Sequence, residues 1–540
     1  MSASLTCTSL AFSWPDGTPV FDGLDIAFGP GRTGLVGANG SGKSTLLKLI
    51  AGQLTPAEGT VRVAGEVGHL PQNVTLDTAL RVDEVLGVAA RRAALHAIEA
   101  GDVSEEHFET VGDDWDVEER ALATLGELGL GHIGLDRRIG EVSGGESVLL
   151  RLAALLLRRP DVLLLDEPTN NLDLYARRRL YSAVASWPGV MVVVSHDREL
   201  LDLVDQIADL RAGEVTWYGG NFSAYEEALA VEQEAAERMV RVAESDLRRQ
   251  KRELVDAQIK LAHRRRYAQK MYDNKREPRA VMKLKSRSAQ VSAGKHRVMH
   301  EEKLAEAKDR LDEAVEAVRD DDEIRVDLPY TAVPQGRTVL TLMDLQLAHG
   351  ARVKGGLDLR GPERVALIGR NGTGKTTLLR TIAGELPPVS GEATVHVPLR
   401  FLPQRLDVLD GELSVAENVA RFAPGATNNR VRARLARFLF RGARADQRAS
   451  TLSGGERFRA ALAALMLAEP APQLLMLDEP TNNLDIASVR QLTSALESYE
   501  GALVVASHDL PFLESIGITR WLMLDGELRE VTPEALEFPA

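Results

Sequence analysis

The chain has 540 residues, of which 44% are hydrophobic and 27% are charged, and it carries a formal net charge of −14. This is the composition of a globular protein long enough for several domains, and its acidic balance by itself argues against a nucleic-acid partner. Apolar runs such as 162–165, 191–194 and 474–477 have the length of strands, and no run approaches the ~20 residues that a membrane span needs. The single cysteine, Cys7, excludes an internal disulfide. Together with an N-terminus that lacks a secretory pattern, it predicts a buried free thiol in a cytoplasmic protein.

A phosphate-binding loop is predicted at 37–44, where the sequence reads Gly-Ala-Asn-Gly-Ser-Gly-Lys-Ser, and again 332 residues later at 369–376, as Gly-Arg-Asn-Gly-Thr-Gly-Lys-Thr. Each loop follows a short apolar run and precedes a helical pattern, so backbone amides and a helix N-terminus can surround phosphate oxygens. In such a loop the Lys side chain reaches the β- and γ-phosphates and the hydroxyl binds Mg²⁺. The predicted ATP-binding residues are Gly37, Asn39, Gly40, Ser41, Gly42, Lys43, Ser44, Thr45, Gly369, Asn371, Gly372, Thr373, Gly374, Lys375, Thr376 and Thr377.

The same further motifs follow both loops in the same order, so the chain contains an internal duplication. In each copy an apolar strand ends in Asp-Glu, which places a carboxylate at the carboxyl edge of an α/β sheet, where ligands bind. A Leu-Pro-Gln motif lies between the loop and that strand, and its Gln can reach the metal and the attacking water. The predicted Mg²⁺ ligands, direct or through water, are Ser44, Gln72, Asp166, Thr376, Gln404 and Asp478.

Three further groups of residues complete each copy. Glu167 and Glu479 directly follow the strand Asp and can polarise the attacking water, as general bases or as water-orienting groups. His196 and His508 follow another apolar strand and can contact the γ-phosphate. Ser-Gly-Gly before a predicted helix offers a hydroxyl and bare amides to an anion. These last residues are predicted to bind ATP, and they are Ser143, Gly144, Gly145, Ser453, Gly454 and Gly455.

The copies are separated by a segment that predicts an antiparallel helical hairpin. Residues 225–269 contain no Pro or Gly, and Val240, Leu247, Leu254 and Leu261 recur every seven residues, as do Leu304, Leu311 and Val318 on the return. Between the arms, residues 260–297 hold 13 Lys and Arg against two acids, which predicts a polyanion-binding tip on an acidic body. The predicted RNA-binding residues are Arg264, Arg265, Arg266, Lys270, Lys275, Arg276, Arg279, Lys283, Lys285 and Arg287.

The first copy is longer than the second between two of the shared motifs. Gln72 and Ser143 are 71 residues apart, whereas Gln404 and Ser453 are 49 apart. The roughly 22 extra residues are expected within about 89–128, as helix.

The motifs together resemble the ATP-binding cassette superfamily, over nearly all of the chain outside 225–330. Within it, the tandem copies, the insertion in the first copy only, the charged helical linker and Thr-Asn-Asn-Leu-Asp after both Asp-Glu pairs resemble the ABC-F family. The resemblance implies an α/β fold of two P-loop cassette domains joined by a long α-helical hairpin. The expected boundaries are 1–222 for the first cassette with its short arm insertion at roughly 89–128, 223–328 for the linker with its basic tip at about 260–297, and 329–540 for the second cassette.

The resemblance also implies composite sites and a partner. Two cassettes close head to tail over two ATP molecules, which would pair Lys43 with Ser453 and Lys375 with Ser143. Trp14 would stack on adenine, and its counterpart near His349 is a poor stacker. ATP and Mg²⁺ would close a monomer that binds the ribosome, with the linker in the tRNA exit site near P-site tRNA and the peptidyl-transferase centre. Hydrolysis would release it, as an antibiotic-protection factor or as a general translation factor.

Two other functions are compatible with parts of the sequence. One is the ATPase subunit of an exporter with a separate membrane protein, which would leave the basic linker without a purpose. The other is a DNA-maintenance ATPase, whose relatives carry longer coiled coils or cysteine-rich zinc modules, and a single Cys excludes the latter. The concentration of positive charge in the linker favours a ribosomal RNA and tRNA partner, through sequence-independent attraction to phosphate, over DNA or a membrane.

Overall fold

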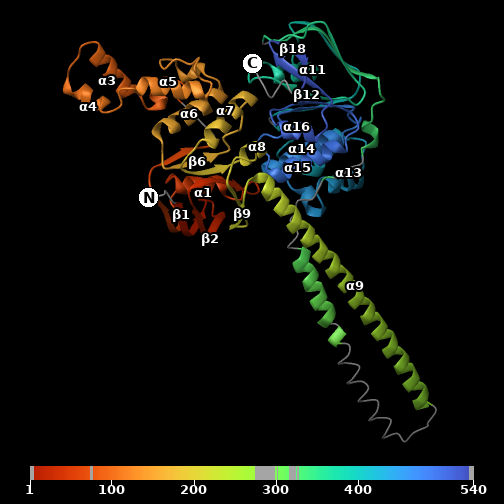
Figure 1. Cartoon of the computed structure of the whole chain (residues 1–540). Coiled ribbons are helices and arrows are strands. Elements are labelled where there is room, and N and C mark those ends of the chain that lie inside the picture. The colour runs from red at the N-terminus through yellow and green to blue at the C-terminus, as the bar shows by residue number, and fades with distance from the viewer. Residues whose placement is uncertain are drawn as a thin grey trace. The chain divides into compact units, whose positions relative to one another are not determined.

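The computed structural model describes residues 5–72, 77–273, 298–300, 302–315, 324, 328–348, 350–404 and 406–533, without the side chains of 264, 265, 268, 269, 271–273 and 329. It forms two compact units: Met1–Ala224 with Glu323–Ala540, and Tyr225–Asp322. The first unit holds both predicted copies and the second is helical (Figure 1).

The first copy is built on a six-stranded sheet in the order β5-β6-β7-β3-β8-β9, in which only the edge pair β8–β9 is antiparallel. A three-stranded antiparallel sheet, β2-β1-β4, stands beside it. The strands are β1 (Leu5–Ser13), β2 (Pro19–Phe28), β3 (Gly31–Val36), β4 (Glu58–Val63), β5 (Val67–Leu70), β6 (Val162–Asp166), β7 (Val190–Val194), β8 (Gln206–Arg211) and β9 (Glu214–Gly219).

The second copy repeats this topology strand for strand, with sheets β14-β15-β16-β12-β17-β18 and β11-β10-β13. Its strands are β10 (Thr338–Gln346), β11 (Gly356–Arg360), β12 (Arg364–Ile368), β13 (Ser390–Val395), β14 (Leu399–Leu402), β15 (Leu474–Asp478), β16 (Ala502–Ala506), β17 (Arg520–Asp525) and β18 (Glu527–Val531). The expected α/β fold of two cassettes with a helical linker is therefore confirmed.

The central strands are apolar on both faces because helices cover both sides of each parallel sheet. All five residues of β6, β7, β15 and β16 are buried. Residues that alternate along these strands belong to two separate hydrophobic clusters in each copy. The covering helices are α1 (Lys43–Ile50), α2 (Val82–Leu86), α6 (Gly144–Arg158), α7 (Leu174–Ala185) and α8 (Arg198–Leu201), and α11 (Lys375–Ile382), α12 (Val415–Phe422), α13 (Asn428–Leu435), α14 (Gly454–Met466), α15 (Ile486–Glu497) and α16 (Leu510–Ser515).

The interval 89–128 of the first copy contains three helices, α3 (Ala89–Glu99), α4 (Glu105–Val111) and α5 (Val117–Glu127). Arg92 of α3 ties this insertion to its surroundings, because its guanidinium lies 3.1 Å from Asp83 of α2 and 3.2 Å from Glu118 of α5. Figure 1 shows α3 and α4 beyond α5, away from the parallel sheet.

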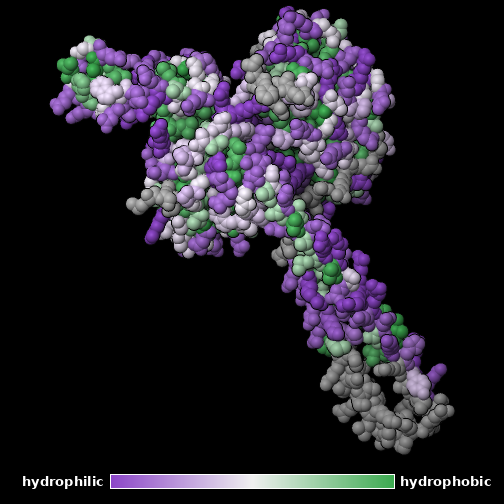
Figure 2. Space-filling view, in the orientation of Figure 1, coloured by the Kyte–Doolittle hydropathy of each residue, from purple (hydrophilic) through white to green (hydrophobic). Residues whose placement is uncertain are grey.

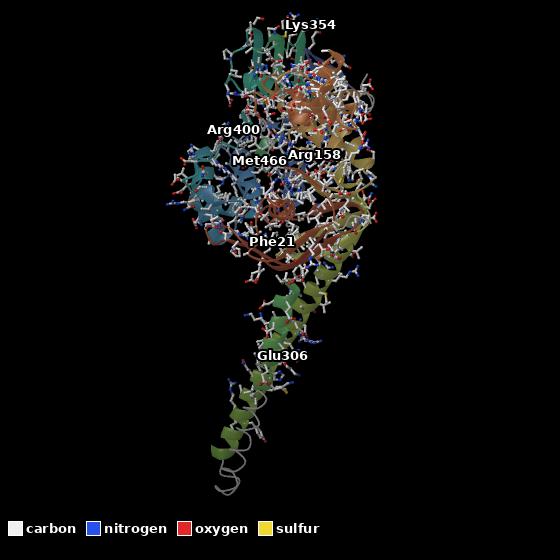
Figure 3. The ribbon with its side chains drawn as sticks, turned by 90° about the vertical axis from the view of Figure 1, so that its left-hand side faces the viewer. Phe21, Arg158, Glu306, Lys354, Arg400 and Met466 are labelled. Atoms are coloured by element: carbon white, nitrogen blue, oxygen red, sulfur yellow. The ribbon has the colours of Figure 1, made fainter. Side chains whose placement is uncertain are left out.

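The linker begins with the 52-residue helix α9 (Phe222–Asp273), which at 1.5 Å per residue is on the order of 80 Å long. A returning helical segment, 302–315, runs beside it, and Glu306 marks that segment in Figure 3. The predicted seam is half-buried at Leu247 and Leu254 on α9 and at Leu304 and Leu311 on the return. Arg310 of the returning segment forms an ion pair with Asp246 of α9 at 2.9 Å. Figure 2 shows mostly hydrophilic residues on the rest of this surface.

No helix in the described part of the chain is both long enough and apolar enough to cross a lipid bilayer.

Cys7 lies on β1, is 1% exposed, and packs in one core cluster of the first copy. Burial raises the pKa of its thiol to about 11. Because thiolate is the reactive form, we expect native protein at pH 8 to react with Ellman's reagent at least about a hundredfold more slowly than unfolded protein. Absorbance of the released thiolate, followed with and without guanidinium, measures both rates. Complete modification of the native protein within the unfolded protein's reaction time would contradict the packing of β1.

Candidate functional site

The functional motifs of each copy meet at one edge of its parallel sheet. In the first copy Leu35 of β3 and Asp166 of β6 both pair with Val194 of β7, so all three strands end at the same level. The segments that follow them are the phosphate loop, Glu167 and His196. The second copy has the same register, in which Leu367 and Asp478 pair with Ala506.

Glycine is required where each phosphate loop leaves its strand. Gly37 has φ 149° and Gly369 has φ 155°. A β-carbon at Gly37 would lie 2.4 Å from the carbonyl oxygen of Leu210, and one at Gly369 would lie 2.3 Å from that of Leu524. No side chain fits such a contact, so the first glycine lets the loop turn tightly against the neighbouring strand.

The loop lysines are buried inside the loops that carry them. Lys43 Nζ donates to the carbonyl oxygens of Gly37 at 2.7 Å and Ala38 at 2.9 Å. Lys375 Nζ donates to Gly369 at 2.8 Å and Arg370 at 3.2 Å. Burial lowers the pKa of both ammonium groups, and the strand carboxylates act in the opposite direction. A cation held in this position is suited to attract phosphate.

The hydroxyl and carboxylate predicted to hold Mg²⁺ are adjacent in both copies. Ser44 Oγ donates to Asp166 Oδ1 at 3.0 Å, and the Thr376 hydroxyl bonds Asp478. The other carboxylate oxygen of each Asp is buried and has no hydrogen-bond partner among the described residues. Burial raises the pKa of both carboxyls. A hydroxyl beside a buried, incompletely satisfied carboxylate fits a Mg²⁺ ion that keeps several waters.

The glutamates after these strands are fixed by an unusual backbone conformation. Glu167 and Glu479 have φ of 48° and 47°, and their amides donate at 2.8 Å to Val194 and Ala506 of the neighbouring strand. Burial raises the pKa of Glu167 to about 8 and that of Glu479 to about 7, while Lys43 and Lys375 oppose the shift. A non-glycine residue held at positive φ next to a ligand-binding edge is typical of a functional site.

The two histidines approach these carboxylates differently. His196 Nε2 lies 3.1 Å from Glu167 Oε1, and His508 Nε2 lies 3.4 Å from Glu479 Oε1. In the second copy His508 Nε2 also lies 2.9 Å from Lys375 Nζ. Because an ammonium only donates, this nitrogen is an acceptor there and carries no proton. Burial lowers the pKa of both rings, so both are neutral near pH 7.

A cavity of about 260 Å³ opens at the first phosphate loop. The loop, Glu167, His196, Gln72 and Trp14 line it together. Trp14 is 38% exposed and forms a T-shaped pair with Phe12, with 5.2 Å between the ring centroids. In the second copy Gln404 is exposed after β14, and His349 lies outside the described residues.

The Ser-Gly-Gly motifs begin long helices. Ser143 caps α6 in a reciprocal pair, in which Ser143 Oγ accepts from the Glu146 amide at 3.3 Å and Glu146 accepts from the Ser143 amide at 2.8 Å. Ser453 caps α14 in the same way. A β-carbon at Gly145 would lie 3.6 Å from Asn371 Nδ2, so the α6 N-terminus faces the second phosphate loop. This agrees with the predicted pairing of Ser143 with Lys375, and the pairing of Ser453 with Lys43 stays a prediction.

Sequence reasoning missed the residues that join the copies. Asp485 Oδ2 accepts from the Asn39 amide at 2.9 Å, and Asp173 Oδ2 accepts from the Asn371 amide at 3.2 Å. The Asn39 side chain also donates to the Asn483 carbonyl at 3.1 Å, and Asn371 donates to Asn171 at 2.7 Å. Both Asp residues end the Thr-Asn-Asn-Leu-Asp motif, which marks the family but does not by itself reveal these contacts.

The predicted RNA-binding residues are only partly described. Arg266 and Lys270 are exposed on α9, as is Tyr267. The side chains of Arg264 and Arg265 lie outside the described residues, as do Lys275, Arg276, Arg279, Lys283, Lys285 and Arg287.

Sequence reasoning also overlooked a second basic region. Residues 421–448 contain eight Arg and one acid, Asp446, a bias that the sequence displays as clearly as the linker does. Part of this region lines a cavity of about 730 Å³ between α13 and the residues that follow α14. Met466, the last residue of α14, is labelled in Figure 3. We call this the arginine groove, and it is lined by Arg430, Arg434 and Arg437 together with Tyr330 and Glu469. Arg434 lies 3.8 Å from Glu469, Arg430 and Arg437 are exposed, and Tyr330 is 72% exposed.

Comparison with known proteins agrees with this geometry. The family model described as ABC transporter matches residues 22–170 and 355–482. The probable ATP-binding protein YheS of Escherichia coli K12 is 31% identical over 543 residues, which cover 95% of this chain and 77% of YheS. The tylosin resistance ATP-binding protein TlrC of Streptomyces fradiae is 34% identical over 524 residues, 92% of each chain.

Among solved structures, the fold is shared with an archaeal ribosome recycling factor, aABCE1, in complex with a ribosomal stalk protein. The TM-score is 0.54 at 19% identity, over 97% of this chain and 89% of that one. A second structure, described as RNase-L Inhibitor, gives a TM-score of 0.53 at 19% identity, over 95% and 87% of the two chains. The matched cassettes and the full-length relatives show that the chain belongs to the ATP-binding cassette family, as a tandem-cassette protein of the ABC-F type.

Proposed function

We propose that this protein is a Mg²⁺-dependent ATPase whose ATP-bound, closed cassette pair binds the ribosome and whose hydrolysis of ATP ends that binding. The observation that carries the proposal is a pair of equivalent hydrogen bonds between the two copies. Each phosphate loop is bonded through its Asn amide to an Asp of the other copy, Asp485 or Asp173. A nucleotide in either loop therefore lies beside residues of both copies, and its presence or loss can be transmitted to their association.

In this proposal each site divides the chemistry among its own residues. Lys43 and Lys375 bind the β- and γ-phosphates, while Ser44 with Asp166 and Thr376 with Asp478 hold Mg²⁺. Held by these residues, Mg²⁺ would supply positive charge to offset the negative charge that develops during phosphoryl transfer. Glu167 and Glu479 orient and polarise the attacking water, and each carboxylate is held at a fixed place by its strained backbone and neighbouring strand.

The ribosomal part of the proposal is supported by charge and by relatives. Exposed basic residues lie on α9 and in the arginine groove, on a chain whose net charge is −14. Localised positive charge attracts RNA phosphate while an acidic body limits unspecific adhesion. The relative TlrC is named a tylosin resistance protein, and aABCE1 is described as a ribosome recycling factor. We propose that the hairpin reaches the tRNA exit site and acts on P-site tRNA near the peptidyl-transferase centre, for general translation or antibiotic protection.

The double variant Glu167→Gln/Glu479→Gln tests this proposal. Removing both polarising carboxylates leaves the Lys and Mg²⁺ contacts intact, so the closed, ATP-bound form accumulates. Loss of both carboxylates should slow hydrolysis by about 10² or more, so the variant stays in its ATP-bound form. We therefore expect its sedimentation with 70S ribosomes through sucrose to increase at least about tenfold with ATP relative to ADP.

The control carries Lys43→Ala and Lys375→Ala in addition and should lose ATP-dependent sedimentation. Absence of binding at low salt, by a double variant shown to retain ATP, would overturn the ribosomal part. Recovery of the same variant with a membrane fraction would indicate an exporter ATPase instead.

A second experiment tests the arginine groove as a phosphate-binding surface. In the Glu167→Gln/Glu479→Gln variant, adding Arg430→Ala/Arg437→Ala should reduce the slope of log affinity for ribosomes against log salt concentration by about one to two. Each phosphate contact contributes somewhat less than one to that slope. Arg430→Lys/Arg437→Lys keeps the charge and should keep most of the slope. Arg62→Ala/Arg211→Ala removes the same charge from an exposed part of the first copy and is the matched control. Equal slopes for the groove variant and this control would show that the groove does not bind phosphate.

A further inference from the structure

One buried cation distinguishes the two copies. Arg177 lies on α7, four residues after Asp173, and is 9% exposed. The equivalent helix α15 also has 12 residues and also starts directly after an Asp, Asp485, so the position equivalent to Arg177 is Val489. Val489 is equally buried at 8% exposed but is apolar.

Arg177 reaches the histidine-bearing loops of both copies. Its Nε donates to the Leu172 carbonyl at 3.3 Å and its Nη1 donates to Asp197 Oδ2 at 3.3 Å, both within the first copy. The same Nη1 lies 3.5 Å from the carbonyl oxygen of His508 in the second copy, at the long end of the hydrogen-bond range. The Tyr181 hydroxyl donates to the same oxygen of Asp197 at 2.7 Å.

Further charges of the second copy act on the guanidinium. Asp509 follows His508 directly and is half-buried, and both Asp509 and Glu479 interact electrostatically with Arg177. A buried guanidinium is stable only where carboxylates and carbonyls surround it. Part of that surrounding comes from the second copy, so Arg177 keeps all of its partners only while the copies are together.

The position of His508 explains what this contact controls. His508 lies between Lys375 and Glu479 at the second nucleotide site, with its ring nitrogen 2.9 Å from the lysine. Arg177 contacts the backbone of the same residue. Val489 has no group that could donate to the loop of His196, so this position cannot make the same contact at the first site.

We propose that Arg177 is a positioning residue that acts from the first copy on the second nucleotide site. It holds the His508 loop, and hence Glu479, in the arrangement needed for turnover when the copies are closed. The Lys43–Glu167 site turns over without an equivalent. The inference rests on the ATPase activity proposed above.

The test isolates each site. Glu167→Gln leaves only the second site competent, and Glu479→Gln leaves only the first. With Glu167→Gln, Arg177→Val should lower kcat about tenfold to a hundredfold, because misplacing a group beside the reacting centre slows the chemical step. KM for ATP should change less than about twofold, because Arg177 acts only in the closed pair, after ATP has bound. With Glu479→Gln, the same change should lower kcat by a much smaller factor, because the Tyr181 hydroxyl still donates to Asp197 beside His196 after Arg177 is removed. Arg177→Lys keeps a donor and a charge and should restore part of the loss.

A second measurement does not depend on turnover by single sites. The Glu167→Gln/Glu479→Gln variant should retain labelled ATP at both sites, and adding Arg177→Val should accelerate release from one of the two. Equal acceleration at both sites, as expected from general destabilisation, or acceleration at neither, would overturn the inference. Absence of ATP hydrolysis by the wild-type protein would instead contradict the proposed ATPase, whatever the Arg177 variants do.

Discussion

Each phosphate loop is held by a carboxylate from the other copy, and the rest of the site depends on this exchange. Asp173 and Asp485 each cap their own helix with one oxygen and bond the opposite loop with the other. Because one carboxylate serves both contacts, the start of α7 or α15 and the facing loop have a fixed separation. A movement of one copy therefore disturbs both a helix cap and a nucleotide loop.

The chemistry is concentrated where burial is least favourable for charge. Two strand carboxylates, two glutamates, two lysines and two histidines are withdrawn from water at the sheet edges, and their pKa values are shifted accordingly. Such an arrangement is costly unless other charges enter it. A nucleotide triphosphate and its divalent cation bring charges of both signs, so binding them offsets the cost of burying these groups.

Much of the fold follows from local sequence patterns. Short sequence patterns are enough to predict the strands that end in Asp-Glu, the glycine-rich loops and the heptad-bearing helix α9. The bond from Asp485 to Asn39 joins positions 446 residues apart, so it depends on how the copies are placed and no local pattern contains it. The significance of Arg177 is hidden for the same reason. The charge bias of the arginine groove is visible in residues 421–448 of the sequence. Its cavity forms only where α13 and the end of α14 come together in space.

Joining both copies in one chain has a consequence for how they can diverge. In an assembly of two identical subunits, a substitution that favours one nucleotide site is imposed on the other as well. Here the positions of Arg177 and Val489 vary independently, because they are encoded separately. The two nucleotide sites of the fused chain can therefore acquire different rates of ATP hydrolysis or release while both halves keep the same sheet topology.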